Sequence, residues 1–297
     1  MYMTVCRKKF RVLCLADWNH HRHGWSAVAS HLVEKFHCDF GVDLYASGVF
    51  AHFNQMNQFI DRPWCAFMHV TPSDPGMVEL LTKNEMWLRS LDFCRGIYVL
   101  TEYGRDFLLP FMPCQVEVLP HILPPMTTRF CPSEYVANEN KKIYAVGHWH
   151  RRYDFFHKMP CSHHEKIMLN CMNNHDLGDV KTMPYLDGES YDSIFVRDIL
   201  FLDFVDSSVS NTIMECIASS TPVLVNRQKG VEEYIGSGYP LFFDRDDFQA
   251  DLLHSDRVLK AHEYLCRIDK SRFGVDSFLQ KIMNGDIYQS LPACMFD

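Results

Sequence analysis

A polar stretch between two apolar runs carries the residues with the clearest chemistry in this chain. Ser207, Ser208 and Ser210 are residue types that begin helices, and apolar residues recur at helical spacing after them. A helix N-terminus presents unpaired N–H groups and the positive end of its dipole, which suit an anion such as a diphosphate. Glu215, the one charge of this helix, stands about one turn further in and could accept hydrogen bonds from a ribose diol. The plainer alternative is a helix cap followed by one surface glutamate.

Two basic pairs could bind the same phosphate oxygens. Arg151 and Arg152 follow an apolar run that ends at Gly147, and each can supply a fork of N–H donors. Gly147 has no side chain, which lets the backbone come close to a ligand. Arg227 and Lys229 follow a second apolar run, at the carboxyl end of a strand, where open α/β sheets bind ligands. For both pairs the alternative is a solvated surface turn.

Candidate acid–base groups follow two apolar runs in the first half of the chain. The loop 17–24 comes after the first run, and its Gly24 permits a tight approach. Its ionisable residues could exchange a proton or orient a hydroxyl group, as could His69 and Asp74 after another run. A histidine in such a place can instead be a hydrogen-bonded structural residue. The candidates in the loop are Asp17, His20, His21 and His23.

The elements that must position these residues are strands alternating with helices. This alternation predicts parallel, doubly wound sheets. The stretch 120–140 instead holds prolines and asparagines with little periodicity, which is linker composition. We therefore expect a Rossmann-like domain over 1–125, a linker over 126–140, a second Rossmann-like domain over 141–270 and a helical tail over 271–297. The strand-like runs are 10–17, 42–46, 64–70, 96–100, 116–119, 142–147, 166–170, 180–184, 199–204 and 222–225.

Length, charge and cysteine usage narrow the class of protein. The 297 residues carry 29 Lys and Arg against 37 Asp and Glu, a net charge of −8, so no global basic field favours nucleic acid. No apolar run is long enough to span a membrane, and we expect no signal peptide or transmembrane segment. The 12 cysteines are dispersed and none forms a Cys-x-x-Cys pair, which indicates reduced thiols. The expected location is cytoplasmic.

The stretch around Glu215 resembles the nucleotide-sugar site of GT-B glycosyltransferases of the family 4-like group. Glu215 and the Ser-Thr-Pro-Val of 220–223 match the second half of that group's E-x7-E…G-T-P-V motif. The first glutamate of the motif falls on Ser207 here, with Asp206 one residue before it, so either Asp206 replaces it or the donor is held differently. Further segments resemble the group in the same order, at 94–105, 116–121 and 142–147. A narrower likeness, at 185–191 and 230–235, is to a branch encoded by large DNA viruses such as chloroviruses.

This resemblance implies a fold and a reaction. The fold would be GT-B: two Rossmann-like, doubly wound parallel-sheet domains facing a cleft, with C-terminal helices crossing back. The reaction would move a hexosyl or pentosyl group from a UDP- or GDP-linked sugar, held by the second domain, to a glycan or glycoprotein hydroxyl held by the first. No metal cofactor would be required. Retention of configuration is expected, whereas inversion would need Asp17, His69 or Asp74 as the base.

The resemblance also implies roles for individual residues. Glu215 would hold the ribose, and Arg151 and Arg152 would hold the diphosphate, whose charge grows as the glycosidic bond breaks. His69 falls where the family often has a histidine that touches the transferred sugar. Further contacts to the diphosphate would come from Gly24, Gly147, Ser207, Ser210, Asn211, Arg227 and Lys229, and contacts to the sugar hydroxyls from Asp206, Glu232 or Glu233.

Three other interpretations stay open on the sequence alone. Cys161, His163, Cys171 and His175 have ligand types that zinc accepts, although their spacing matches no standard zinc finger. The GT-B fold also serves sugar-nucleotide epimerases, which need acidic groups for proton abstraction. The serine at position 207, where the family has a glutamate, would suit a non-catalytic domain that binds nucleotide sugar or carbohydrate. Hydrolysis of the donor would separate an enzyme from such a binding protein.

Overall fold

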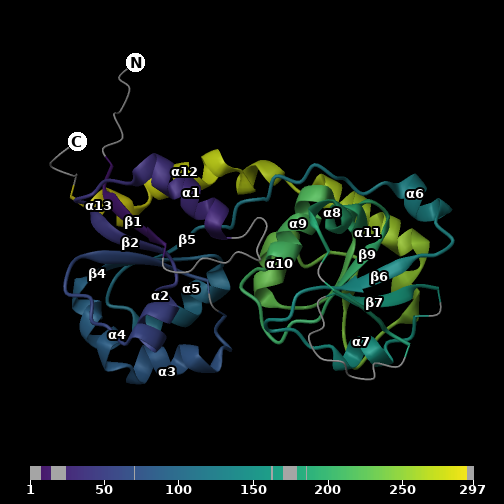
Figure 1. Ribbon diagram of the computed structural model, residues 1–297, viewed down its shortest axis with the longest axis horizontal. Helices are drawn as coiled ribbons and strands as arrows, with labels where there is room; N and C mark the ends of the chain where they lie inside the picture. Colours follow the sequence, from purple (N-terminus) through teal and green to yellow (C-terminus); the bar gives the residue numbers. More distant parts are fainter. Residues whose placement is uncertain are drawn as a thin grey trace, which may run out of the picture. The chain divides into compact units, whose positions relative to one another are not determined.

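The computed structural model describes residues 8–14, 25–69, 71–161, 163–169, 179–184 and 186–292. The chain forms two compact units (Figure 1). Unit 1 combines the residues up to Ile122 with those from Ser271 onward, and unit 2 runs from Leu123 to Lys270. Unit 1 is therefore built from both ends of the chain.

The sheet of unit 1 has five parallel strands that lie in chain order. Their residues are mostly buried, as expected for a parallel sheet covered on both faces. The strands are β1 (Phe10–Cys14), β2 (Val42–Ser47), β3 (Trp64–Met68), β4 (Cys94–Val99) and β5 (Val116–Val118). The helices among them are α1 (Trp25–Phe36), α2 (Val49–Ala51), α3 (Pro75–Lys83), α4 (Glu85–Ser90) and α5 (Glu102–Leu108). Shorter turns are a π segment at His52–Met56 and 3₁₀ segments at Leu91–Phe93 and Leu109–Phe111.

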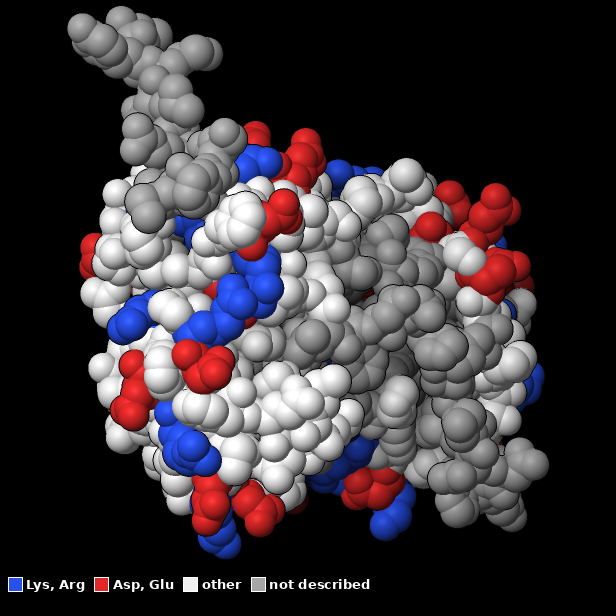
Figure 2. Space-filling view, turned by 60° about the vertical axis from the view of Figure 1, so that its left-hand side comes forward, with Lys and Arg blue, Asp and Glu red and all other residues white. Residues whose placement is uncertain are grey.

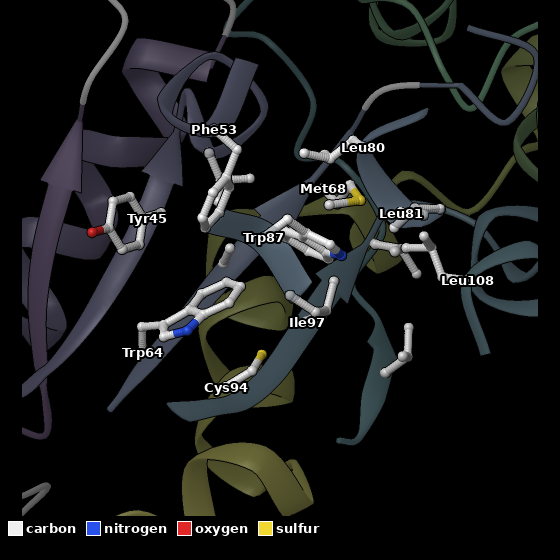
Figure 3. Packing of buried hydrophobic residues seen from close by; sticks show 14 of the residues in the cluster. Tyr45, Phe53, Trp64, Met68, Leu80, Leu81, Trp87, Cys94, Ile97 and Leu108 are labelled. Carbon is white, nitrogen blue, oxygen red and sulfur yellow. The ribbon is translucent and has the colours of Figure 1, made fainter. Parts of the chain in front are cut away.

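One face of this sheet packs an aromatic cluster. Side chains alternate along a strand, so every second residue of β3 reaches this face, beginning with the fully buried Trp64. From β4 the fully buried Ile97 and the residue Val99 reach it as well. The ring of Trp64 lies 5.7 Å from that of Trp87 on α4, which lies 5.2 Å from that of Phe53. Figure 3 shows these residues on the side of the sheet away from the C-terminal helix drawn in yellow.

The C-terminal helices cover the other face of the same sheet. They are α12 (Val275–Asn284) and α13 (Asp286–Ser290). Phe278 of α12 stacks on Phe67 of β3 with 6.1 Å between ring centroids, and Tyr288 of α13 lies 5.4 Å from Phe10 of β1. The helical tail therefore crosses back onto the N-terminal sheet.

Gly96 of β4 makes this packing testable. A Cβ atom at position 96 would lie 2.5 to 2.6 Å from three carbon atoms of Ile287 on α13. We expect Gly96→Ala to lower the free energy of unfolding, measured in urea, by about 1–3 kcal/mol, the range for an overpacked core. Trimming the partner should restore part of this loss, so Gly96→Ala with Ile287→Ala should be more stable than the two single changes predict together. Strictly additive losses would show that α13 does not press on β4.

The sheet of unit 2 has six parallel strands in the order β11-β10-β9-β6-β7-β8. This is the doubly wound order, in which the chain first builds outward from one side of β6 and then from its other side. The reversal lies between β6 and β9, so the loops after these two strands flank the crevice where such sheets bind ligands. The strands are β6 (Lys142–Ala145), β7 (Glu165–Leu169), β8 (Lys181–Met183), β9 (Ile199–Leu202), β10 (Val223–Asn226) and β11 (Phe242–Phe243).

The helices of unit 2 are α6 (Pro132–Ala137), α7 (Asp154–Lys158), α8 (Gly188–Arg197), α9 (Asn211–Ser219), α10 (Lys229–Ile235) and α11 (Ser255–Arg267), with a 3₁₀ segment at Ala250–Leu253. A further 3₁₀ segment, Lys270–Phe273, begins at the last residue of unit 2 and continues into unit 1. Helix α9 is buried from Thr212 to Ser219, including the charged Glu215. Residues 126–140, expected as a linker, pack within this unit. Tyr135 of α6 is fully buried there, and the backbone N–H of Phe130 donates to the Ser219 carbonyl at 3.1 Å.

Both predicted parallel sheets are present, which confirms the predicted α/β fold class. Within the described ranges no helix is both long and apolar enough to cross a membrane. Figure 2 shows one face of the molecule, where the coloured basic and acidic side chains are interspersed. This distribution agrees with the modest net charge of −8.

Candidate functional site

The loops after three neighbouring strands of unit 2 bring most of the predicted binding residues to one edge of the sheet. β10, β9 and β6 are adjacent and parallel, so their carboxyl ends share that edge. The loop after β6 carries residues 147–152, the loop after β9 carries 203–210, and 227–229 follow β10. Helices α9 and α10 start from the second and third of these loops (Figure 1).

Arg151 is a half-buried cation whose charge no carboxylate balances within the described residues. Its guanidinium stacks on the ring of Phe204 at 3.8 Å, and its Nε is buried without a hydrogen-bond partner in that part of the chain. A hydrogen bond of 3.5 Å joins its Nη1 to the carbonyl oxygen of Trp149. Burial lowers the pKa of Arg151 to about 10, and the phenols of Tyr153 and Tyr191 act against this shift. The group still carries its proton at neutral pH, so a bound anion would balance it.

Gly147 leaves the approach to this cation open. Its φ of 77° lies in the left-handed region, which glycine adopts without strain. A Cβ atom there would stand 3.7 Å from Nε and 3.8 Å from Nη2 of Arg151. The glycine therefore leaves uncovered the side of the guanidinium that a side chain at position 147 would touch.

Hydrogen bonds fix the platform beneath Arg151. The carbonyl of His150 accepts from the N–H of Val205 at 3.0 Å, which joins the loops after β6 and β9. Asn226, the last residue of β10, bonds both backbone groups of Phe204. Its Oδ1 accepts from the N–H at 2.8 Å, and its Nδ2 donates to the carbonyl at 2.9 Å. Three strands therefore hold the aromatic ring on which the guanidinium lies.

Arg152, by contrast, has a carboxylate of its own. Its Nη2 donates to Oδ1 of Asp203 at 3.0 Å and to the carbonyl of Phe204 at 2.7 Å. Asp203 is 1% exposed and also lies 3.4 Å from Nε of Arg245. Burial raises the pKa of Asp203, and the two arginines act against that shift. The positive charge of Arg152 is thus balanced within the protein.

Helix α9, which starts from the loop after β9, carries a buried carboxylate. Ser210 caps the helix by accepting from the N–H of Ile213 at 3.3 Å. Glu215 is 5% exposed, and its Oε2 accepts a 3.0 Å hydrogen bond from the hydroxyl of Tyr191 on α8. Helices α8 and α9 lie side by side in Figure 1. The Tyr191 phenol also raises the pKa of Arg151.

The turn before α9 is buried and packs closely against α10. Oδ1 of Asp206 accepts from the N–H of Ser207 at 2.8 Å, and both residues are at most 5% exposed. A Cβ atom at Gly230 of α10 would lie 2.2 Å from the carbonyl oxygen of Ser207 and 2.4 Å from that of Ser208. Only glycine allows the two backbones to approach this closely. The turn delivers the chain to Asn211, the first residue of α9.

Basic side chains satisfy the other end of α9. Arg129 and Lys270 both donate to the carbonyl of Ala218, the second at 3.3 Å. Nζ of Lys270 also donates to Oγ of Ser220 at 2.7 Å. Positive groups at a helix C-terminus complement the helix dipole. An anion at the N-terminus would complement the opposite end in the same way.

The candidates after β10 pair with one another. Nη1 of Arg227 donates to Oε1 of Glu232 at 2.6 Å and to the carbonyl of Ser237 at 3.1 Å. Arg227 and Glu232 thus balance each other's charge. Lys229 and Glu233 lie on the exposed side of α10.

Unit 1 holds the remaining candidates. The ring of His69, just after β3, lies 5.2 Å from that of Trp25, the first residue of α1. Asp74 caps α3, since its Oδ1 accepts from the N–H of Gly76 at 2.9 Å. Outside the described residues lie Asp17, His20, His21, His23 and Gly24.

The proposed zinc ligands do not form a cluster in the part of the chain that the structure describes. There, no three His, Cys, Asp or Glu side chains lie together as a metal ion would need. Sγ of Cys161 donates to the carbonyl of His164 at 3.4 Å, and Nε2 of His164 lies 3.2 Å from the hydroxyl of Tyr135. Burial lowers the pKa of His164 to about 4, so this ring is neutral at pH 7. Cys171 and His175 lie outside the described residues.

Sequence reasoning did not identify Tyr191 and Phe204 as parts of this site. Phe204 ends an apolar run and is expected as a core residue, and Tyr191 occupies one position on an amphipathic helix. Their spacing from Arg151 along the chain carries no signal, because only the sheet order brings them to it.

Comparisons with known proteins show the fold. No protein-family model matches the chain, and no curated protein sequence does. Among solved structures it is similar to a trehalose-6-phosphate synthase of Burkholderia multivorans, with a TM-score of 0.58, 9% identity and coverage of 86% of this chain and 73% of that one. For HepE of Anabaena in complex with UDP-glucose, the TM-score is 0.60 and the identity 13%, over 87% of this chain and 80% of that one. For the trehalose-6-phosphate synthase OtsA the TM-score is 0.60 and the identity 12%, over 90% and 76%. The chain therefore has the two-sheet α/β fold of these GT-B glycosyltransferases.

Proposed function

We propose that this chain is a glycosyltransferase whose unit 2 binds a nucleotide-diphosphate sugar. The observation that carries the proposal is the guanidinium of Arg151, which is half-buried against Phe204 and which no carboxylate of the described residues balances, beside the strands where the sheet order reverses. A diphosphate offers two adjacent charged groups whose oxygens suit the fork of guanidinium donors. HepE, solved with UDP-glucose, has the same fold and supports the proposal.

In the proposed reaction the protein stabilises the departing diphosphate without a metal cofactor. Negative charge grows on that group as the glycosidic bond breaks, and preorganised donors are the means to offset it. Arg151 supplies the cation, and the N-terminus of α9, which starts at Asn211 after the Ser210 cap, supplies backbone N–H groups. Glu215 accepts the ribose hydroxyls. Arg152 acts in this scheme through Asp203 and Phe204, by fixing the loops.

The acceptor in this proposal is a hydroxyl group of a glycan or glycoprotein, and the transfer retains configuration. A similar solved structure concerns glycosyl transfer with retention by a trehalose-6-phosphate synthase, which supports this choice. Asp206 is the proposed contact to the donor sugar, because Ser207 occupies the place of the family's first glutamate. For an inverting reaction the base would come from Asp17, His69 or Asp74.

A ligand panel tests the proposal. Thermal melts are recorded with UDP, GDP, ADP, dTDP, their glucose conjugates and inorganic pyrophosphate, each with EDTA present. A ligand that binds only the folded chain stabilises it by about 2.7 kcal/mol at 100 times its Kd. We expect one nucleoside diphosphate series to raise the melting temperature and its sugar conjugate to be hydrolysed slowly without an acceptor. No shift with any nucleotide would contradict the proposal, and binding without hydrolysis or transfer would indicate a non-catalytic binding protein.

A further inference from the structure

Tyr191 contacts the candidate ribose carboxylate from a neighbouring helix. Its hydroxyl donates to Oε2 of Glu215 at 3.0 Å, and the rest of its ring packs edge-on against Phe195 at 5.3 Å between centroids. Phe195 is fully buried, and its carbonyl accepts from Oγ1 of Thr221 at 2.7 Å. The phenol is therefore held in place by the core of unit 2.

The start of α8 is fixed as well. Oδ1 of Asp187 caps the helix by accepting from the N–H of Ser190 at 2.8 Å, and the Asp187 carbonyl accepts from the N–H of Tyr191 at 2.9 Å. A side chain on a capped helix and against a buried ring loses few rotamers on binding a ligand. Tyr191 is thus suited to hold one orientation of Glu215.

The covalent order of a nucleoside diphosphate places its ribose at this pair. The ribose joins the diphosphate to the base, so a diphosphate on Arg151 brings the ribose to the next polar groups. We place the ribose at the carboxylate of Glu215 and the phenol of Tyr191, because α9 follows β9, and β9 pairs with β6, whose loop carries Arg151.

The chemistry of the pair favours a ribose that has both hydroxyl groups. An ionised carboxylate only accepts hydrogen bonds, and its two oxygens can accept from neighbouring hydroxyls. A bond from a fixed phenol sets the rotation of the carboxylate and therefore the directions in which it accepts. A ligand without the 2′-hydroxyl would make one hydrogen bond fewer to this carboxylate, and sites built to bond a hydroxyl group discriminate strongly against analogues that lack it.

We infer that Tyr191 is a positioning residue that orients Glu215 so that the site selects ribonucleoside diphosphates against their 2′-deoxy counterparts. The inference rests on the proposed function. It adds a substrate class, since it predicts UDP-, GDP- or ADP-linked donors and disfavours donors linked to a deoxyribonucleotide. It also assigns to α8 a part in recognition that the motif on α9 does not contain.

The test compares ligands that differ by one hydroxyl group. Affinities for UDP, 2′-deoxy-UDP, GDP, 2′-deoxy-GDP and pyrophosphate are measured by calorimetry on the full chain and on Tyr191→Phe, Glu215→Gln and Tyr153→Phe. For the base that binds, the unmodified chain should prefer the ribonucleotide about 10- to 100-fold, the range for a hydrogen bond to a charged group. In Tyr191→Phe this preference should fall to about threefold or less, with pyrophosphate affinity unchanged. Glu215→Gln should show the same loss of preference.

Tyr153→Phe is the matched control. Tyr153 also acts on the pKa of Arg151, but the bond to Oε2 of Glu215 comes from Tyr191. The Tyr153→Phe variant should prefer the ribonucleotide as strongly as the unmodified chain does. Melting temperatures should confirm that all variants fold. A Tyr191→Phe variant that binds nucleotides and keeps the full preference would overturn the inference and leave the proposed function intact. Binding of no nucleoside diphosphate by the unmodified chain would overturn both.

Discussion

Arg151→Met is expected to lower the affinity for a nucleoside diphosphate about 100-fold without weakening the fold. A hydrogen bond to a charged group contributes about 1.5–3 kcal/mol, so the loss of two such bonds gives about this factor or more. The change also removes a half-buried charge that no described carboxylate balances. The free energy of unfolding should therefore stay the same or rise. Calorimetry with UDP and GDP measures the affinity, and urea melts of the same samples measure the stability.

Arg152→Met is the control with the opposite expectation. Oδ1 of Asp203 would lose its 3.0 Å partner, and the carbonyl of Phe204 would lose a 2.7 Å bond. Arg245, at 3.4 Å, would remain near the carboxylate. The unfolding free energy should fall by about 1–3 kcal/mol, the cost of an unsatisfied buried group, while nucleotide affinity falls less than in Arg151→Met. If Arg152→Met abolishes binding and Arg151→Met does not, the diphosphate cation has been assigned to the wrong arginine.

The difference between these two arginines marks the limit of what the sequence shows. Both are basic, adjacent and just past a strand, so the pattern gives them the same role. Their environments differ because Asp203, which is 51 residues further along the chain, reaches Arg152, whereas the ring of Phe204 reaches Arg151. Parallel pairing of β6 with β9 creates both contacts. No local spacing encodes that register.

The fold itself follows more directly from the sequence. The apolar run 199–204 predicts a strand, and β9 ends two residues earlier, at Leu202. The last two residues of the run, Asp203 and Phe204, lie beyond the end of β9. Asp203 accepts a hydrogen bond from Arg152, and the ring of Phe204 stacks with Arg151. The strand's hydrophobic pattern thus continues into the site, because Phe204 is buried by a guanidinium and not by the core alone. The apolar pattern predicts this strand, but it cannot distinguish a core aromatic residue from one on which a ligand-binding arginine stacks.

The stretch 126–140 also shows what local composition cannot predict. Prolines and asparagines there suggest a linker, yet Tyr135 is fully buried and the backbone N–H of Cys131 donates to the carbonyl of Val196 at 2.7 Å. Backbone bonds to a folded unit can hold a segment that has no periodicity of its own. Such bonds depend on the partner's position in space, which the local composition does not carry.

Gly230→Ala is expected to lower the free energy of unfolding by about 3 kcal/mol, at the upper end of the range for overpacking. The added Cβ would lie 2.2 Å from the carbonyl oxygen of Ser207 and 2.4 Å from that of Ser208. Both are backbone atoms, so no side-chain rotation relieves the clash. Helix α10 cannot retreat either, because Val231 and Ile235 anchor it in the core at 0% and 2% exposure. The turn before α9 must move, and nucleotide affinity should fall with it.

Helix propensity and the backbone clash predict opposite changes in the free energy of unfolding for Gly230→Ala. Alanine stabilises the interior of a helix by about 1 kcal/mol relative to glycine, so helix propensity alone predicts a gain at position 230. The contact with the turn predicts a loss. Gly238→Ala supplies the baseline, since a Cβ atom there would meet nothing closer than 3.9 Å. Urea melts and calorimetry with UDP and GDP on both variants give the answer. A Gly230→Ala chain that is more stable and binds nucleotide unchanged would show that α10 does not hold the turn. A less stable chain with weakened binding would show that the glycine of α10 supports the N-terminus of α9 as an anion site.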